Sequence, residues 1–562
     1  MKNKLSKKHI VNPKTKALGL GKLENFFESN SFIYMFMGAV ILLILIARLH
    51  LLSVPFERDE GEYAYMGTLI LDGHSPYTFA YNMKYPGTYL MYAIMMGIFG
   101  KTVESIHLGL MLISIASLIL VYFISTKFLS KSSSAIAAST FGILATSWTM
   151  LGQAAHATNF VIFFALFGIL ILQKSYQNVN GSILWLFLSG MMFSLAYISK
   201  QSGLFFLIFA LSFIVIKDYK VLSSLAIIKR LLLILLGFAI PVILMFLYFY
   251  IFGDFEKFWF WTVTYLSKYG SQMNLSRGYD NFLLSIRIIT GNYTSEGYVI
   301  FWFIGLLGLG LLYFMKMDYR KKLIIASFVL MSFLTVVPGY YFRNHYYITF
   351  LPALAILIGV FFEYFKNIYR DKLKFPLLTS VNILFFVILI SVSLSANSQY
   401  LFSRDNNITC KMIYGENPFV ESFEIAEYLK ANTSHKDKIA IIGSEPQIYF
   451  YADRYSATGY IYTYNLVELH DYALIMQKEM IREIEANEPK YIVFVNARIS
   501  WLIQENSERY IFKWSEDYIK NNYLLVGSMD ISPKQIGRLI TGENLKNFKS
   551  HTGQTVSIYQ RL

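Results

Sequence analysis

The chain has 562 residues, of which 55% are hydrophobic and only 15% are charged. Soluble domains carry about 25% charged residues, so this composition excludes an ordinary soluble enzyme and indicates a protein with many membrane spans. The formal net charge of +14 would suit nucleic acid, but seven lysines lie in the first 22 residues and most other basic residues lie in short loops between apolar runs. That distribution is typical of cytoplasmic loops, so we expect no nucleic acid partner. The single cysteine, Cys410, excludes an internal disulfide framework and a cysteine-cluster metal site.

Hydropathy predicts about eleven spans, each close to the roughly 20 residues that a bilayer requires. The predicted spans are 31–52, 104–126, 133–151, 157–173, 182–199, 202–217, 230–252, 297–315, 323–338, 346–363 and 375–396. The first span is too long for the apolar core of a signal peptide and lacks a small-residue cleavage site, so we expect it to stay uncleaved.

Lysines and arginines assign the two sides of the membrane. With the amino terminus inside, every second loop is basic and the other short loops are nearly free of basic residues, as the positive-inside rule predicts. The predicted organisation is a basic cytoplasmic segment (1–30), a membrane domain (31–397) with a long first outer loop (53–103), and a soluble extracytoplasmic domain (398–562). We expect the protein in the plasma or inner membrane.

Unusual polar residues gather on the outer side. They lie in the stretches FERDEGEYAYMG (56–67), GQAAHATN (152–159), SKQSG (199–203) and PGYYFRNHYY (338–347). Ionisable groups close to the membrane are costly and tend to mark function. The sequence therefore predicts one shared site on the outer face, although outer loops are also generally wetter than spans.

The acidic stretch predicts a helix that begins at or just after Asp59 and Glu60 and ends at a turn near Gly73. We expect this amphipathic helix to lie on the outer surface, where its dipole keeps Asp59 ionised and able to accept a proton. N-capping is the commonest role of such an aspartate, but a cap needs only one of the four carboxylates present. Further along, Lys84 lies at headgroup depth, where it either meets a phosphate or merely snorkels.

Four elements of this loop follow a known order: Asp59-Glu60, then Tyr63, then the turn 73–77, then Lys-Tyr-Pro-Gly at 84–87. In that order they resemble the first outer loop of the GT-C superfamily of membrane glycosyltransferases. More narrowly, they are similar to the branch containing dolichyl-phosphate-mannose–protein mannosyltransferases and the lipid A aminoarabinose transferase. The stretches around 199–203 and 341–355 are weaker echoes of the same pattern.

The resemblance implies transfer of a sugar, for example a hexose such as mannose, from a polyprenyl-phosphate donor to a protein, glycan or lipid acceptor. A single displacement would invert the anomeric centre. Independently, the acceptor hydroxyl must lose a proton, for which a carboxylate is a suitable base, and the lipid phosphate leaving group needs cations. We predict Asp59 as the base with Glu60 beside it. The predicted phosphate-binding residues are Arg58, Lys84, Lys200 and Arg343, and the predicted substrate-binding residues are Tyr63, Gln201, His345 and Tyr346.

Two departures from the pattern remove potential ligands of a metal ion. Some relatives carry acids where this chain has Met83 and Asn159. His156 and His345 could still contribute ligands, but lone histidines beside spans are more often structural. We predict no metal and no cofactor.

Beyond residue 405 the composition becomes that of a soluble domain. Segments 438–443, 491–496, 523–529 and 555–561 predict strands, with a helix between the first two. The segment 443–463 follows the first strand and could shape an acceptor cleft. The predicted fold is thus a polytopic α-helical membrane protein of GT-C type with a C-terminal extracytoplasmic α/β domain.

Two other classes stay open. A transporter or flippase of lipid-linked saccharide would also place charges on membrane helices, but no inverted repeat or broken mid-membrane helix is visible. A scaffold protein would leave the grouping of Asp59, Lys84 and Arg343 on one face without a reason. We therefore favour the glycosyltransferase.

Overall fold

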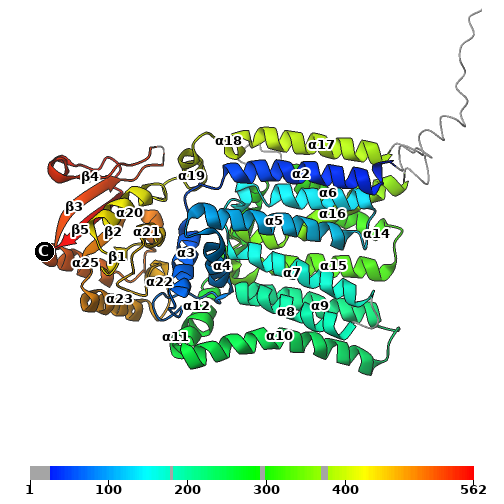
Figure 1. Ribbon diagram of the computed structural model, residues 1–562, viewed down its shortest axis with the longest axis horizontal. Helices are drawn as coiled ribbons and strands as arrows, with labels where there is room; N and C mark the ends of the chain where they lie inside the picture. Colours follow the sequence, from blue (N-terminus) through cyan, green and yellow to red (C-terminus); the bar gives the residue numbers. More distant parts are fainter. Residues whose placement is uncertain (1–25, 178–181, 292–297, 369–377, 534) are drawn as a thin grey trace, which may run out of the picture.

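The structure, a computed structural model, describes residues 26–177, 182–291, 298–368, 378–533 and 535–562. Figure 1 shows two parts: a bundle of long, roughly parallel helices, and a smaller domain with a sheet at one end of the bundle. Helices α3 and α4 lie between the two parts, and α2 begins at the bundle end that is remote from the C-terminal domain.

Helices occupy all eleven predicted spans. They are α2 (Asn30–His50), α5 (Val103–Ser125), α6 (Lys131–Leu144), α7 (Ala157–Ser175), α8 (Ser182–Ser199), α9 (Leu204–Asp218), α10 (Ser224–Phe252), α14 (Val299–Phe314), α15 (Tyr319–Leu334), α16 (Leu351–Ile368) and α17 (Leu378–Ala396). Within the described residues, seven helices are long and apolar enough to cross a membrane, and α8 and α14 are shorter apolar helices. The prediction of a polytopic helical membrane protein is confirmed.

The predicted span 133–151 is shorter as a helix, because α6 ends at Leu144. The chain then doubles back on the helix end, where a Cβ at Gly152 would collide with the carbonyl of Ala145. The buried Arg48 of α2 donates hydrogen bonds to the carbonyls of Ala145 (2.9 Å) and Gly152 (3.1 Å). A partner from another helix thus satisfies the carbonyl of Ala145, which helix continuation would otherwise have paired.

Helix crossings in the bundle depend on glycine. At the contact of α8 with α10, Gly190 and Gly237 each lie directly against a backbone carbonyl of the opposing helix, and Gly308 of α14 does the same against α16. Small residues at such crossings let the backbones approach, which is how helices associate in lipid.

The first outer loop forms α3 (Arg58–Leu71) and α4 (Gly87–Phe99). The predicted extent of α3 is right, but its predicted place on the outer surface is wrong. Most of α3 is buried, and a Cβ at Gly61 would lie 2.6 Å from the backbone nitrogen of Gln447 in the C-terminal domain. The sequence could not reveal this cover, because the domain that supplies it lies almost 400 residues further along the chain.

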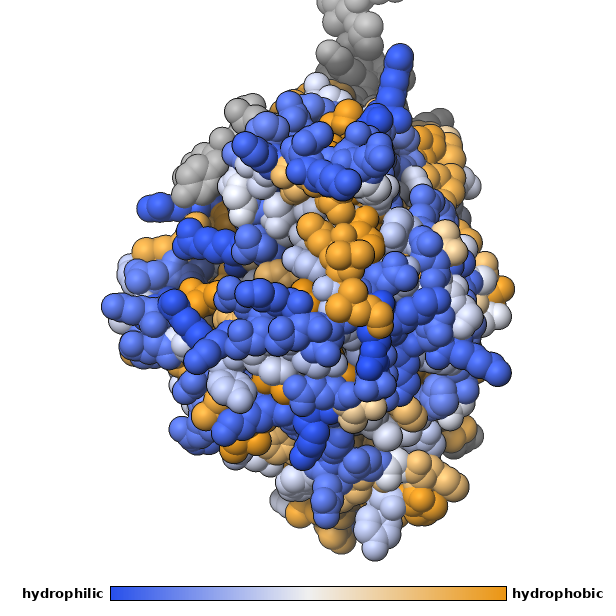
Figure 2. Space-filling model, turned by 90° about the vertical axis from the view of Figure 1, so that its left-hand side faces the viewer, coloured by the Kyte–Doolittle hydropathy of each residue, from blue (hydrophilic) through white to orange (hydrophobic). Residues whose placement is uncertain are grey.

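The C-terminal domain contains a five-stranded sheet in the order β1-β2-β5-β3-β4. Its strands are β1 (Ile439–Ile442), β2 (Tyr491–Asn496), β3 (Tyr523–Asp530), β4 (Ile540–Thr541) and β5 (Thr555–Arg561). Among the described strands, only β1 and β2 pair in parallel, with helix α23 (Ala473–Asn487) in the connection between them. The four predicted strands are confirmed. Figure 2 shows that the end of the molecule formed by this domain is mostly hydrophilic, as expected of a domain outside the membrane.

The first loop and the C-terminal domain share one hydrophobic core, in which Phe56 and Tyr65 pack with Tyr449 and neighbouring residues. Hydrogen bonds cross the same boundary. The hydroxyl of Tyr65 accepts from the amide of Ser456 at 2.8 Å, and the amide of Tyr81 donates to a carbonyl of the domain, also at 2.8 Å. The domain is therefore fixed on the loop that carries the acidic stretch.

Candidate active site

A pocket with about 780 Å³ of empty space lies where the bundle, the first loop and the C-terminal domain meet. Its charged lining residues are Asp59, Glu62, Lys84, Lys200, Arg343 and Glu468. Its aromatic lining residues are Tyr63, Tyr81, Trp261, Tyr265, Tyr269, Tyr346, Tyr462 and Tyr464, joined by His345. Six segments of the chain (59–84, 157–158, 200, 261–269, 343–346 and 462–468) thus contribute to one concave surface.

Asp59 lies in the first turn of α3, and its side chain lines the pocket. The helix is capped by Glu57, whose carboxylate accepts from the amide of Glu60 at 3.0 Å, so Asp59 is free of the capping role. The hydroxyl of Tyr63 donates to Asp59 Oδ2 over 3.3 Å. A carboxylate at a helix N-terminus is favoured by the helix dipole.

The charge state of Asp59 follows from its surroundings. Burial alone would raise the pKa of the Asp59 carboxyl, but the field of Lys84, followed by those of His156, Arg343 and Lys200, outweighs burial and lowers that pKa. Asp59 is therefore an ionised carboxylate at neutral pH, which is the form that accepts a proton.

Three cations face the same pocket. Lys84 Nζ lies 3.7 Å from Glu62 Oε2 and over the ring of Tyr63. Lys200 Nζ lies 3.4 Å from the ring centre of Tyr346, and the guanidinium of Arg343 lies 5.8 Å from the ring centre of Tyr341. Among the described residues, neither Lys200 nor Arg343 has an acidic partner. Lys200 and Arg343 are therefore cations with which an anionic ligand could form an ion pair.

Two neighbouring groups titrate near neutral pH. Burial, followed by repulsion from Lys84, lowers the pKa of Lys200 to about 7, although Asp59 opposes the change. Burial raises the pKa of Glu62 to about 7, against the opposing field of Lys84. Both are consequences of enclosing several ionisable groups in a site with little water, which is typical of functional sites.

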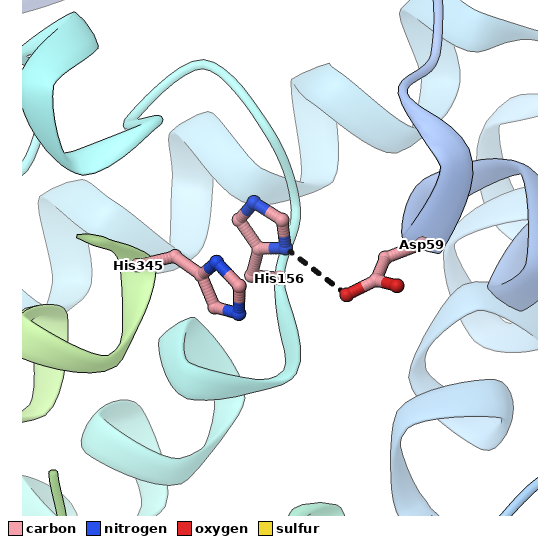
Figure 3. Close-up of side chains that lie close together, drawn as sticks. All are labelled: Asp59, His156 and His345. Atoms are coloured by element: carbon pink, nitrogen blue, oxygen red, sulfur yellow. Dashed lines mark ion pairs between the residues drawn. The ribbon is translucent and has the colours of Figure 1, made fainter. Parts of the chain in front are cut away.

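Two histidines extend the site beside Asp59, as Figure 3 shows. The rings of His156 and His345 stack with their centres 3.9 Å apart, and His156 Nδ1 lies 4.0 Å from Asp59 Oδ2. One ligand atom from each of the three residues lies within 4.8 Å of the others. Both ring nitrogens of His156 are buried and have no hydrogen-bond partner among the residues that the structure describes. Nitrogen and oxygen donors of this kind fit Zn²⁺, but the nearby cations oppose a metal ion.

Arg58 is not part of the pocket, contrary to the prediction that it binds phosphate. Its Nη2 forms a 2.8 Å ion pair with Glu445 Oε1, and both side chains are buried. Its other nitrogens donate to the carbonyl of Ser444 and to the hydroxyl of Tyr464. Arg58 therefore attaches the start of α3 to the C-terminal domain.

Glu60 also lies outside the pocket, so the prediction that it orients a substrate is not supported by its position. Its Oε1 accepts from the amide of Ala155 at 2.7 Å and lies 3.0 Å from His107 Nε2. Gln201, predicted to bind substrate, instead donates from Nε2 to the carbonyl of Met83 at 2.9 Å and so supports the loop that carries Lys84. The other predicted residues, Asp59, Tyr63, Lys84, Lys200, Arg343, His345 and Tyr346, all line the pocket.

The wall that the C-terminal domain contributes was not identified residue by residue from the sequence. Tyr462, Tyr464, Asn465 and Glu468 come from a segment that begins inside the 443–463 stretch, which was predicted only to shape an acceptor cleft. The one sequence feature that marks this segment is its high density of tyrosines. That feature is uninformative here, because 17% of the whole chain is aromatic.

Comparison with known proteins agrees with this architecture. Residues 83–245 match the family model described as dolichyl-phosphate-mannose-protein mannosyltransferase. No curated protein sequence matches the chain. ArnT from Cupriavidus metallidurans, solved with bound undecaprenyl phosphate, has a TM-score of 0.56 at 13% identity over 83% of this chain and 94% of that protein.

Two further solved structures are similar over nearly the whole chain. ArnT from Cupriavidus metallidurans in the apo state has a TM-score of 0.55 at 12% identity and covers 94% of this chain and 98% of that protein. The oligosaccharyltransferase of Archaeoglobus fulgidus, tethered to an acceptor peptide, has a TM-score of 0.52 at 11% identity over 94% of this chain and 76% of that protein. At such identities these likenesses establish the fold. The chain thus shares its fold with these solved proteins, and its residues 83–245 match the model of the dolichyl-phosphate-mannose-protein mannosyltransferase family.

Proposed function

We propose that the protein transfers a hexose from a polyprenyl-phosphate donor to an acceptor hydroxyl on the extracytoplasmic face of the plasma or inner membrane. Mannose is the first sugar to test, because the matching family model describes mannosyltransferases. The proposal for the carrier is supported by ArnT, which was solved with undecaprenyl phosphate, and by the Archaeoglobus oligosaccharyltransferase, which was solved with a dolichol phosphate.

One observation carries the proposal. An ionised carboxylate, Asp59, faces a pocket whose wall holds Lys84, Lys200 and Arg343, and the last two have no acidic partner among the described residues. A donor with a negatively charged phosphodiester and a neutral sugar supplies the missing negative charge and places its reacting carbon near a base.

In the proposed reaction, the acceptor oxygen attacks the anomeric carbon while Asp59 takes the hydroxyl proton. The new glycosidic bond forms as the bond from the anomeric carbon to the phosphate oxygen breaks, with inversion. The negative charge that develops on the departing polyprenyl phosphate is stabilised by the lysines and the arginine, which are already in place before reaction. The acceptor class, whether protein, glycan or lipid, is left to the assay.

We also propose that transfer proceeds without a metal ion. Lys84, Lys200 and Arg343 already provide the positive charge that a divalent cation would otherwise supply. The cluster of Asp59, His156 and His345 is the place where an ion would bind if this is wrong. Transfer rates should then be the same with and without a chelator, and a loss restored by added Zn²⁺ or Mn²⁺ would overturn this part of the proposal.

The test of function follows label from polyprenyl-phosphate sugars into native acceptor extract, in membranes that contain wild type or Asp59→Asn at equal expression. The variant should lose about 10²-fold or more of the transfer rate, as expected of a missing general base. The matched control is Asp72→Asn, because Asp72 is an exposed carboxylate at the other end of the same helix. Normal transfer by Asp59→Asn would exclude Asp59 as the base, and no transfer by wild type from any donor would redirect work to transport assays.

A further inference from the structure

Arg343 follows a backbone segment with an uncommon conformation. Gly339, Tyr340 and Phe342 have positive φ angles of 77°, 57° and 45°. Residues other than glycine rarely adopt such angles, so the surroundings must hold the segment in place. The side chain of Arg343 makes no hydrogen bond or ion pair with any described residue, and its guanidinium lies over the ring of Tyr341. The position of the guanidinium therefore depends on how Tyr341 is held.

Tyr341 is held by the segment around α12 (Leu266–Gly270). Its ring stacks on that of Tyr269, with centres 4.6 Å apart and an interplanar angle of 9°. Its hydroxyl donates to Gln272 Oε1 at 3.1 Å. The stacking fixes the plane of the ring, and the hydrogen bond fixes its distance from the α12 segment.

A carboxylate of the C-terminal domain anchors that segment in turn. Glu468 Oε2 accepts a 2.8 Å hydrogen bond from the hydroxyl of Tyr265 and a 3.4 Å hydrogen bond from Gln272 Nε2. Glu468 directly follows α22 (Tyr464–Val467), and both Glu468 and Arg343 line the pocket. The amide of Gln272 thus bridges Glu468 and Tyr341, giving a continuous chain from the soluble domain to the loop that carries Arg343.

We infer that Glu468 is a positioning residue that sets the place of Arg343 through Gln272 and Tyr341. The inference rests on the proposed function, in which Arg343 binds the donor phosphate. It makes the C-terminal domain a working part of the donor site, because without the Glu468 oxygen both Tyr265 and Gln272 lose an acceptor and the Tyr341 hydroxyl loses a fixed partner.

The test uses the full-length protein in detergent and measures binding of undecaprenyl phosphate and, in parallel, dolichyl phosphate. Glu468→Ala and Tyr341→Phe should each weaken binding about 5- to 10-fold, the effect of losing a buried hydrogen bond. Glu468→Gln keeps an acceptor oxygen and should stay within about 2-fold of wild type. The matched control is Tyr455→Phe, which removes a 2.9 Å hydrogen bond to Asp72 across the same domain boundary but away from the pocket, and should bind like wild type.

A double-mutant cycle separates positioning from direct contact with the ligand. In an Arg343→Ala background, Glu468→Ala should cause no further loss of binding, because its effect passes through the guanidinium. A full additional loss in that background would show that Glu468 acts on the ligand itself and would overturn the inference, as would wild-type binding by Glu468→Ala. In assays of transfer, the donor KM should rise while the acceptor KM stays unchanged. Failure of the wild-type protein to bind either lipid phosphate would remove the proposed function first, and this inference with it.

Discussion

The ion pair between Arg58 and Glu445 provides the strongest test of how the two parts of the protein are joined. The exposed fraction is 6% for Arg58 and 0% for Glu445, so Glu445→Ala leaves a buried guanidinium without its counter-charge. Breaking one side of a buried pair typically costs about 3–5 kcal/mol. For a domain of the size of the C-terminal domain, such a loss lowers the unfolding temperature by roughly 6–20 °C.

The assay heats detergent-solubilised variants and measures the fraction that remains folded by size-exclusion chromatography. Arg58→Ala should be destabilised like Glu445→Ala, whereas the double variant Arg58→Met with Glu445→Leu should lose less than either single change, because no buried charge is left unpaired. The matched control is Asp453→Ala. It breaks the 2.6 Å pair with Lys101 across the same boundary, but both of those side chains are about one-third exposed, so the cost should be at most about 1 kcal/mol.

The opposite result would restore the role that the sequence predicted. If Arg58→Ala keeps wild-type stability but loses binding of polyprenyl phosphate, then Arg58 binds the donor and its contact with Glu445 is incidental. If both Arg58→Ala and Glu445→Ala behave like Asp453→Ala, the junction depends on the shared hydrophobic core alone.

Two further predictions concern the pocket and its supporting helix. Because the pKa of Lys200 is lowered to about 7, Lys200 loses its charge as pH rises through 7. Donor affinity should therefore fall by up to about 5-fold between pH 7 and 8, while the phosphodiester keeps its charge. Lys200→Ala should make donor Kd depend less on pH. The remaining dependence should come from Glu62, which gains negative charge over the same pH range. An unchanged pH dependence in Lys200→Ala would exclude Lys200 as its source. Separately, Gly61→Ala should cost about 1–3 kcal/mol in the thermal assay, because its Cβ would overlap Gln447, whereas Gly38→Ala, with open space around it, should cost nothing measurable.

Much of the fold could be predicted because a membrane helix is recognisable from the hydropathy of its own residues. Apolar runs near 20 residues located all eleven span helices, and short apolar runs located four of the five strands of the C-terminal domain. The end of α6 could not be predicted in this way. It depends on Arg48, which hydrogen-bonds to the carbonyls of Ala145 and Gly152 from about 100 residues earlier in the chain.

The pocket was predictable to the extent that its residues had to lie on one side of the membrane. Lys84, Lys200 and Arg343 were expected to share the outer face, and the structure brings them to one pocket with Asp59. The residues that the C-terminal domain contributes to the pocket could not be predicted individually. The sequence around a tyrosine or a carboxylate in a soluble domain does not show which distant residues it contacts. Only the three-dimensional contacts of Glu468 with Tyr265 and Gln272 reveal which domain face meets the pocket.

The geometry of α3 explains why the three neighbouring residues Arg58, Asp59 and Glu60, which the sequence placed in one site, do not share it. Successive residues of an α-helix point about 100° apart, so Arg58, Asp59 and Glu60 cannot all face the same pocket. The structure separates them: Arg58 pairs with Glu445 of the C-terminal domain, Glu60 contacts His107 and an amide of the bundle, and only Asp59 lines the pocket. Two oppositely charged neighbours thus fasten the first turn of α3 to the two halves of the protein. Asp59, held between them, is positioned by both. If Asp59 is the proposed base, a change at either neighbour should therefore reduce the transfer rate, although neither neighbour lines the pocket.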